Sequence, residues 1–225
     1  MEHLTSTQHE ILTALKFRHA TKEFDIHKKI TDSDFQFILE TGRLSPSSYG
    51  FEPWRFVVVQ NQEIREKLRP YASGAQKQLT TASHFMLILS RLPKDMVADS
   101  DYIKYMMENV QELPPEIVRA KGTTYDKFLR TGFRLQDNER VMFEWSCRQT
   151  YLALGNMMTS AALIGIDSCP MEGFERDNLE KVLIDEGIMD PEHFGISCMV
   201  AFGYRLHEPA KKTRQSPEQV IQWVR

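Results

Sequence analysis

One stretch of this chain has almost no polar side, and it constrains the fold more than any other feature. The polar sequence at residues 137–140 can open a helix, and a helical pattern then continues to Ile164. The later turns of this helix are apolar nearly all round, through Tyr151, Leu154, Met157, Met158, Ala161 and Ala162. A helix of this kind is buried on every side. It either packs between its own sheet and a second subunit, or it is the central core helix of a monomer.

Apolar runs elsewhere predict the strands against which this helix can pack. We expect buried strands at residues 56–59, 83–89 and 196–204, and a shorter one within residues 165–174 that breaks into a Pro/Gly turn. Further helical patterns occupy residues 11–16, 31–39, 63–68 and 175–183. Residues 94–137 are polar, and Pro114-Pro115 interrupts any single helix there. We therefore expect that region to form a helical excursion covering a site.

Length and composition indicate one domain spanning residues 1–225. A hydrophobic content of 41% allows this chain to bury one substantial core. The formal net charge of -3 argues against a nucleic acid or an acidic membrane as partner and favours small molecules. Because no apolar run is long enough to span a membrane and the polar start at residues 1–3 lacks a signal-peptide pattern, we expect a cytoplasmic protein. Three cysteines without metal or redox spacing are expected as reduced core thiols: Cys147, Cys169 and Cys198.

The loop at residues 44–56 carries more chemistry than a connector needs. Two prolines fix φ at two points, and Gly50 between them permits a positive φ. Ser47 and Ser48 add hydroxyl groups beside backbone N–H groups that no regular element uses. Such a loop can grip a polar, planar ligand between aromatic walls, for which the candidates are Tyr49, Phe51 and Trp54. An ordinary helix-to-strand connection is the alternative.

Three other segments concentrate polar chemistry. Arg18, His19 and Lys22 crowd the end of the first helix, where they can also simply complement the helix dipole. The turn at residues 169–174 presents backbone N–H groups at a strand-to-helix junction; it can bind a ring nitrogen or serve only as a connector. The basic tail at residues 211–214 is either a binding element or a solvated segment.

Together these segments resemble the FMN-dependent nitroreductase family in order and spacing. Residues 18–22 resemble the family's Arg-x-Ser/Thr segment, and residues 45–54 resemble its Pro-Ser-Ser…Gln-Pro-Trp loop. Residues 169–174 look like its turn beside the isoalloxazine ring, and residues 212–214 look like its closing Lys-x-Arg pair. The resemblance covers nearly the whole chain. It implies an α+β fold with a central mixed sheet flanked by helices, built as an intertwined homodimer with FMN at the subunit interface.

The resemblance also assigns roles to individual residues. Arg18, Lys212 and Arg214 are expected to bind the FMN phosphate, with His19 assisting there or at the ribityl chain. Lys22 is expected at the flavin N1/O2 edge, where it stabilises the negative charge of the reduced flavin. Glu172 is the second expected catalytic residue, through its backbone N–H beside that of Gly173. The full set of expected cofactor contacts is Arg18, His19, Ala20, Thr21, Lys22, Pro46, Ser47, Ser48, Gly50, Gln78, Pro170, Met171, Glu172, Gly173, Lys212 and Arg214.

The chain departs from the family pattern at several positions. Ala20 stands where a hydroxyl is common, Gly50 where many members have Asn, and Glu52 where many have Gln. Ala75 replaces an Asn near the pyrimidine edge, which leaves Gln78, and Gln76 as second choice, to contact that edge. The tail from about residue 205 to residue 225 is expected to reach the partner subunit.

The resemblance implies a ping-pong reaction in which NAD(P)H gives a hydride to flavin N5 and leaves, after which a nitroaromatic or quinone accepts two electrons. The resemblance implies NAD(P)H as a co-substrate, and an enzyme of this family does not need the dinucleotide fingerprint that this chain lacks. The chain also has no Walker loop and no His-Glu-x-x-His motif, and no metal is expected. A dihydropteridine or free-flavin reductase on the same fold stays open, as does a non-enzymatic flavin-binding protein. Candidates for aromatic substrate contacts are Tyr125, Phe128 and Phe133.

Overall fold

Four strands form one sheet in the computed structural model, which describes residues 4–225 and so leaves the polar start at residues 1–3 outside. Their order is β1-β2-β4-β3, with bounds Trp54–Val58, His84–Arg91, Phe194–Gly203 and Asp167–Met171 in that order. Each neighbouring pair is antiparallel. The predicted α+β class is confirmed, but the mixed sheet is not seen in these strands. The parallel pairing among the described residues is an isolated bridge between Ala20 and Ser168.

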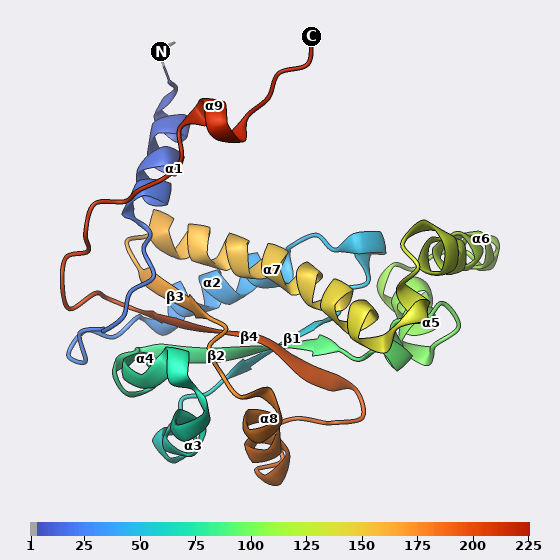
Figure 1. The fold of residues 1–225 in the computed structure, drawn as a ribbon, viewed down its shortest axis with the longest axis horizontal. Helices are drawn as coiled ribbons and strands as arrows, with labels where there is room; N and C mark the ends of the chain where they lie inside the picture. Colours follow the sequence, from blue (N-terminus) through green and yellow to red (C-terminus); the bar gives the residue numbers. More distant parts are fainter. Residues whose placement is uncertain (1–3) are drawn as a thin grey trace.

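Helices cover both faces of this sheet (Figure 1). α2 (Asp32–Arg43) and α7 (Glu139–Leu163) pack together over one face, and α1 (Ser6–Phe17) packs against α7. The opposite face carries α3 (Gln62–Leu68), α4 (Gln76–Thr81) and α8 (Arg176–Asp185). The helices expected at residues 11–16, 31–39, 63–68 and 175–183 are all present. The largest differences are that α1 begins at Ser6 rather than at residue 11 and that α2 ends at Arg43 rather than at residue 39.

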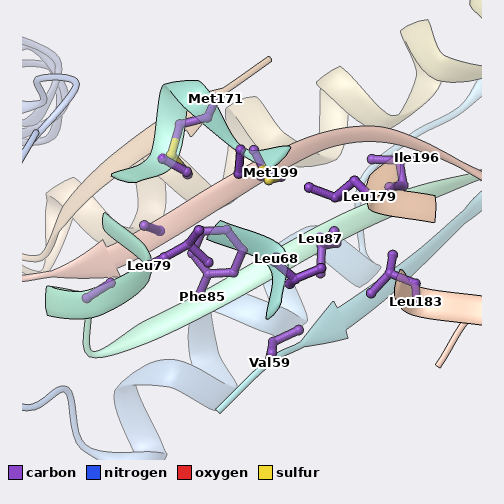
Figure 2. Close-up of a cluster of buried hydrophobic side chains, with 14 of the residues drawn as sticks. Val59, Leu68, Leu79, Phe85, Leu87, Met171, Leu179, Leu183, Ile196 and Met199 are labelled. Atoms are coloured by element: carbon purple, nitrogen blue, oxygen red, sulfur yellow. The ribbon is translucent and has the colours of Figure 1, made fainter. Parts of the chain in front are cut away.

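The period of the strands sorts apolar side chains onto the two faces. On β2, Phe85, Leu87 and Leu89 point to the side of α3, α4 and α8, whereas Met86 and Ile88 point to the side of α2 and α7. Figure 2 shows the first of these two clusters, in which Leu68, Leu79 and Leu179 from the three helices meet the sheet. Two separate buried layers therefore fix the sheet from both sides and hold the strand ends in place.

The long helix α7 is only partly enclosed within one chain. Asn138 caps its start by accepting hydrogen bonds from the N–H groups of Arg140 (2.8 Å) and Val141 (3.3 Å). One face packs on α2 and the sheet, but Tyr151 and Leu152 remain 40% and 47% exposed. Burial on every side, as predicted from the sequence, is therefore not reached by contacts within the described chain.

The expected excursion at residues 94–137 is helical and has a hydrophobic cluster of its own. It contains α5 (Asp101–Tyr105), a π-helical turn at Met106–Val110, α6 (Pro115–Lys127) and a second π-helical turn at Phe128–Gly132. Pro115 is the first residue of α6. Proline is tolerated there because a backbone N–H in the first turn would have no acceptor within the helix. This region stands at one end of the sheet (Figure 1), and its buried side chains pack around Phe51 of the 44–56 loop and Trp145 of α7.

The remaining segment is the C-terminal tail. It contains α9 (Pro217–Val220) and ends in an extended segment that points away from the sheet (Figure 1). Trp223 is 79% exposed there. The three cysteines are free and buried, as predicted. Among the helices of residues 4–225, none is both long enough and apolar enough to cross a membrane.

Candidate functional site

Three cations gather where the tail meets the end of α1. Lys212 donates hydrogen bonds from Nζ to the carbonyl oxygens of Leu15 (2.7 Å) and Arg18. Burial, together with the nearby charges of Arg18 and Arg214, lowers the pKa of Lys212 below the usual lysine range. Within residues 4–225, none of these three cations forms an ion pair. Uncompensated like charges held together favour an anion, above all one with two charges.

His19 lies beside this cluster with one ring nitrogen unused. Its Nδ1 is 2.7 Å from the carbonyl oxygen of Phe17, so Nδ1 carries the proton and donates it. In the neutral ring Nε2 is then an acceptor, and this atom is buried with no hydrogen-bond partner in the described chain. The buried hydroxyl of Ser168, on the strand that Ala20 bridges, also lacks a partner there. Buried polar atoms are rarely left unpaired, so each of these two atoms needs a hydrogen-bond partner from a ligand or a water molecule.

A buried ion pair between Asp167 and Arg205 holds the segment at residues 17–21. Asp167, at the start of β3, pairs with the Arg205 guanidinium at 2.6 Å and also accepts from the Arg205 backbone N–H at 3.0 Å. Arg205 donates to the Phe17 carbonyl oxygen at 3.0 Å, and Thr21 donates its hydroxyl toward Asp167 at 3.4 Å. These contacts tie residues 17–21 to the edge of the sheet. Sequence reasoning missed this pair, because its members are distant in the chain.

Lys22 follows this segment and is exposed, beside a cavity of about 410 Å³. The neighbouring Glu23 does not neutralise it, since Glu23 pairs with Lys77 at 2.6 Å and lies 3.9 Å from His207. The cavity is lined by His19, Ala20, Thr21, Lys22, Glu23, Lys77, Arg205, His207, Glu208, Pro209 and Ala210. An exposed ammonium that lines this cavity can approach the edge of a planar ligand.

The turn after β3 offers two free donors. Within residues 4–225, the N–H groups of Glu172 and Gly173 donate no hydrogen bond, and both residues are exposed. The Gly173 carbonyl oxygen is fixed by the N–H of Gly74 (2.7 Å) and the hydroxyl of Ser73 (3.2 Å). The two glycines touch so closely that a Cβ on Gly173 would lie 3.0 Å from Gly74 Cα. The Gly74 contact therefore fixes the turn, whose two N–H groups have no acceptor among the described residues.

The Glu172 side chain is held separately from its backbone. Tyr151 of α7 donates its hydroxyl to the Glu172 carboxylate. Burial and this hydrogen bond raise the pKa of Tyr151 well above its usual range. Both side chains line a cavity of about 720 Å³ with Cys147, Arg148 and Arg176 among its other walls. The sequence placed Tyr151 only in the apolar helix and gave no signal for this contact.

The loop at residues 44–56 differs from its prediction in one respect. Its N–H groups are largely used inside the chain: Ser48 donates to Gln149 Oε1 (2.8 Å), Glu52 to Ser47 Oγ (2.8 Å) and Gly50 to the Ser47 carbonyl oxygen (2.9 Å). The predicted grip through free N–H groups is therefore wrong for these donors. Pro46 is exposed, and Ser47, Ser48 and Gly50 are half-buried. None of the loop's hydrogen bonds within residues 4–225 reaches residues 17–22 or 170–173.

The pyrimidine-edge candidates are less accessible than expected. Gln78 is only 3% exposed, and its amide nitrogen donates toward the Cys169 sulfur at 3.5 Å. Gln76 donates its amide to the carbonyl oxygens of Arg69 (2.7 Å) and Ala72 (2.9 Å). Pro170 is half-buried and Met171 is buried, both at the end of β3. Residues 18–22, 170–173 and 212–214 thus come from three elements that meet at one edge of the sheet.

The three aromatic residues of the excursion that are candidate substrate contacts differ in solvent exposure. Tyr125 is fully buried and donates its hydroxyl to the Met96 carbonyl oxygen at 2.6 Å, so it is a core residue. Phe128 is half-buried between Tyr49, Tyr125 and Trp145. Phe133 is 56% exposed and is the one of these three that solvent reaches most.

Comparison with known proteins identifies the family of this chain. A model of the nitroreductase family matches residues 15–204. The chain belongs to the nitroreductase family. It is 55% identical over 215 residues to "Putative NAD(P)H nitroreductase YfkO" of Bacillus subtilis, covering 96% of this chain and 97% of that protein. A Staphylococcus haemolyticus protein of the same description is 53% identical over 221 residues, or 98% of this chain and 100% of that one.

Solved structures agree on the fold. The nitroreductase YdfN of Bacillus subtilis superposes with a TM-score of 0.77 at 22% identity, over 96% of this chain and 99% of that one. A nitroreductase of Exiguobacterium sibiricum, solved in complex with FMN, superposes with a TM-score of 0.74 at 20% identity, over 95% and 97%. The family resemblance and the oxidoreductase class predicted from the sequence are therefore confirmed, and the individual residue roles stay predictions.

Proposed function

We propose that this nitroreductase-family chain holds FMN and uses NAD(P)H to reduce nitroaromatics or quinones in two-electron steps. The observation that carries the proposal is the group of Arg18, Lys212 and Arg214, because three close cations that form no ion pair within residues 4–225 suit the phosphate of a mononucleotide. Family membership supports it, and so does the FMN found in the Exiguobacterium relative.

The neighbouring residues fit the rest of such a cofactor. His19 offers the lone pair of a buried Nε2, which suits a hydroxyl of the ribityl chain better than a phosphate oxygen. The free N–H groups of Glu172 and Gly173 suit ring acceptors such as N5 and O4, while the Glu172 carboxylate stays on Tyr151. The Gly74 contact keeps those two donors from drifting. A flavin bound here supplies the hydride-accepting and hydride-donating ring.

Lys22 is the residue we assign to the chemistry itself. An exposed ammonium beside the 18–21 segment can lie at the N1/O2 edge, where negative charge develops on reduction. Its contribution is electrostatic and largest in the reduced state, so it acts on the rate of reduction more than on retention of the cofactor. A ping-pong order follows if nicotinamide and oxidant use the same face in turn.

A homodimer is part of this proposal. Among residues 4–225, the loop at residues 46–50 makes no hydrogen bond to residues 17–22 or to residues 170–173, and we propose that it completes the site of a partner subunit. Apolar side chains left exposed on α1, α7 and the tail support such an interface: Ile11, Leu12, Leu15, Tyr151, Leu152, Leu163, Ile164, Val220 and Trp223. The tail is proposed to lie on the partner. We propose the cytoplasm as the compartment, which cell fractionation tests.

The test compares FMN with riboflavin, which lacks the phosphate. Arg214→Ala should weaken FMN binding by about 10- to 100-fold, the loss of a charge-assisted hydrogen bond, and leave riboflavin binding unchanged. Lys22→Ala should instead slow flavin reduction by NAD(P)H with little change in FMN retention. Arg119→Ala, on the exposed side of α6, is the matched control. Equal losses for FMN and riboflavin in Arg214→Ala would remove the phosphate assignment.

A further inference from the structure

The backbone of the 44–56 loop is held in an unfavourable conformation. Tyr49, Gly50 and Glu52 have φ values of 59°, 70° and 45°. Only Gly50 adopts such a left-handed conformation without cost, so the two other residues carry strain. Backbone of this kind persists only where its surroundings enforce it, and it is concentrated at sites that hold ligands.

Three side chains of the excursion hold the carbonyl groups of this strained backbone. Gln111 donates its amide to the carbonyl oxygens of Tyr49 (3.1 Å) and Gly50 (2.8 Å), and Lys121 donates Nζ to Tyr49 (2.9 Å). The hydroxyl of Tyr102 lies 2.7 Å and 2.8 Å from the carbonyl oxygens of Phe51 and Glu52 and is shared between them. Every carbonyl group from residue 49 to residue 52 is thereby engaged.

The clamp is itself braced. Lys121 also donates to Gln111 Oε1, which fixes the orientation of the Gln111 amide, and its ammonium lies 5.2 Å from the centre of the Phe51 ring. The Tyr49 ring packs 4.8 Å from that of Tyr125 and 5.4 Å from that of Phe128. Burial lowers the pKa of Lys121 below the usual lysine range. Burial raises the pKa of Tyr102 to about 12, so its hydroxyl keeps the donor proton at neutral pH.

We propose that Tyr102, Gln111 and Lys121 are positioning residues, a clamp through which the excursion sets the shape of the loop that faces the flavin of the partner subunit. This inference rests on the proposed function, because it takes residues 46–50 to complete the partner's site. The excursion then does more than cover the pocket: its packing determines where Ser47 and Ser48 stand. A displacement of α6 is transmitted to the cofactor through backbone carbonyl groups.

The first experiment measures the flexibility of the loop at residues 44–56 in FMN-free protein. Amide hydrogen exchange of the peptide spanning residues 44–56 is measured in FMN-free wild type, Lys121→Met and Tyr102→Phe, with Lys127→Met on the same helix as the control. We expect faster exchange in this peptide in both clamp variants, with unchanged exchange in the sheet and with a wild-type rate in Lys127→Met. Unchanged exchange in the clamp variants overturns the clamp.

The second experiment links the clamp to flavin. FMN affinity should fall about 5- to 10-fold in Lys121→Met and in Tyr102→Phe, the effect of one or two lost hydrogen bonds. Adding Glu52→Gly to Tyr102→Phe should restore both the affinity and the slow exchange, because glycine accepts the φ of 45° without strain. A role in general stability alone would not be rescued in this way.

The two experiments distinguish failure of the proposed FMN-dependent function from failure of the clamp. Absence of FMN binding in wild type defeats the proposed function, whereas the exchange data still report on the clamp. Faster loop exchange with unchanged FMN affinity defeats the positioning role while leaving the proposed function intact. Unchanged affinity of the Glu52→Gly, Tyr102→Phe double variant relative to Tyr102→Phe contradicts the claim that left-handed strain is what the clamp offsets.

Discussion

Replacing Gly173 by alanine tests whether close backbone packing builds the Glu172 turn. Gly173 does not need glycine for a positive φ; it needs it because its Cα faces the backbone of Gly74. A Cβ there would lie 3.0 Å from both Gly74 Cα and Gly74 N. Carbon atoms pack at about 3.5–4.0 Å, so the two segments must separate by roughly 0.5–1 Å. Neither neighbour is a flexible side chain, and the strain cannot be absorbed locally.

The size of the effect follows from this shift. Overpacking of this kind costs about 1–3 kcal/mol of unfolding free energy. A displacement of roughly 0.5–1 Å also moves the N–H groups of Glu172 and Gly173 beyond the 2.7–3.2 Å range of a good hydrogen bond to the flavin. Losing two bonds to the flavin at about 0.5–1.5 kcal/mol each weakens FMN binding by about 5- to 150-fold.

The assay is a fluorescence titration of FMN together with thermal unfolding of the FMN-free protein. Gly74→Ala provides a second view of the same contact, because its Cβ would lie 3.1 Å from Gly173 Cα, and it should behave like Gly173→Ala. Gly122→Ala is the matched control, since nothing lies within 4 Å of its Cβ and alanine favours the helix. Wild-type FMN affinity and thermal stability in Gly173→Ala would refute the reasoning.

Two further predictions concern Arg65 and Lys212. Arg65 is 1% exposed and donates to the carbonyl oxygens of Val59 (2.7 Å), Ala82 (3.0 Å) and Leu79 (3.3 Å). Arg65→Met leaves these buried acceptors unpaired and should lower the unfolding free energy, measured by urea titration, by about 3–5 kcal/mol. Arg65→Lys should lower it by less than Arg65→Met does. A loss below roughly 1 kcal/mol in Arg65→Met would show that water replaces the guanidinium. For Lys212 the lowered pKa means that its charge is lost as pH rises through a value below the usual lysine range. FMN retention should therefore fall on the alkaline side in wild type and persist to higher pH in Lys212→Arg; identical profiles would exclude titration of Lys212 as the cause.

Local signals in the sequence were sufficient for most of the architecture. Thr31 and Asn138 accept hydrogen bonds from the first turns of α2 and α7, as short polar residues before an apolar period predict. The strands were visible as apolar runs, whereas the α+β class came from the family resemblance. The antiparallel pairing was not visible, because the order of strands in space depends on contacts between distant segments.

Candidate site residues could be predicted only where the signal lies within one segment of the sequence. Arg18, Lys22 and Lys212 were found as clustered charges, and the Glu172 turn was found from its Pro/Gly punctuation. Contacts between segments could not be seen: the tie of Gly74 to Gly173 spans 99 positions, and the Lys121 bond to Tyr49 spans 72. The same limit explains Gln78, which the family resemblance suggested as a ligand contact although the fold buries it against Cys169.

The central claim is that this chain binds a flavin that nicotinamide can reduce. The most direct measurement is the visible absorption spectrum of the purified, FMN-supplied protein under anaerobic conditions, recorded before and after adding NADPH and then NADH. The account predicts a yellow protein whose flavin band bleaches with at least one of the two nicotinamides. A protein that stays colourless after FMN is supplied and desalted, or a flavin band that persists with both donors, would contradict it.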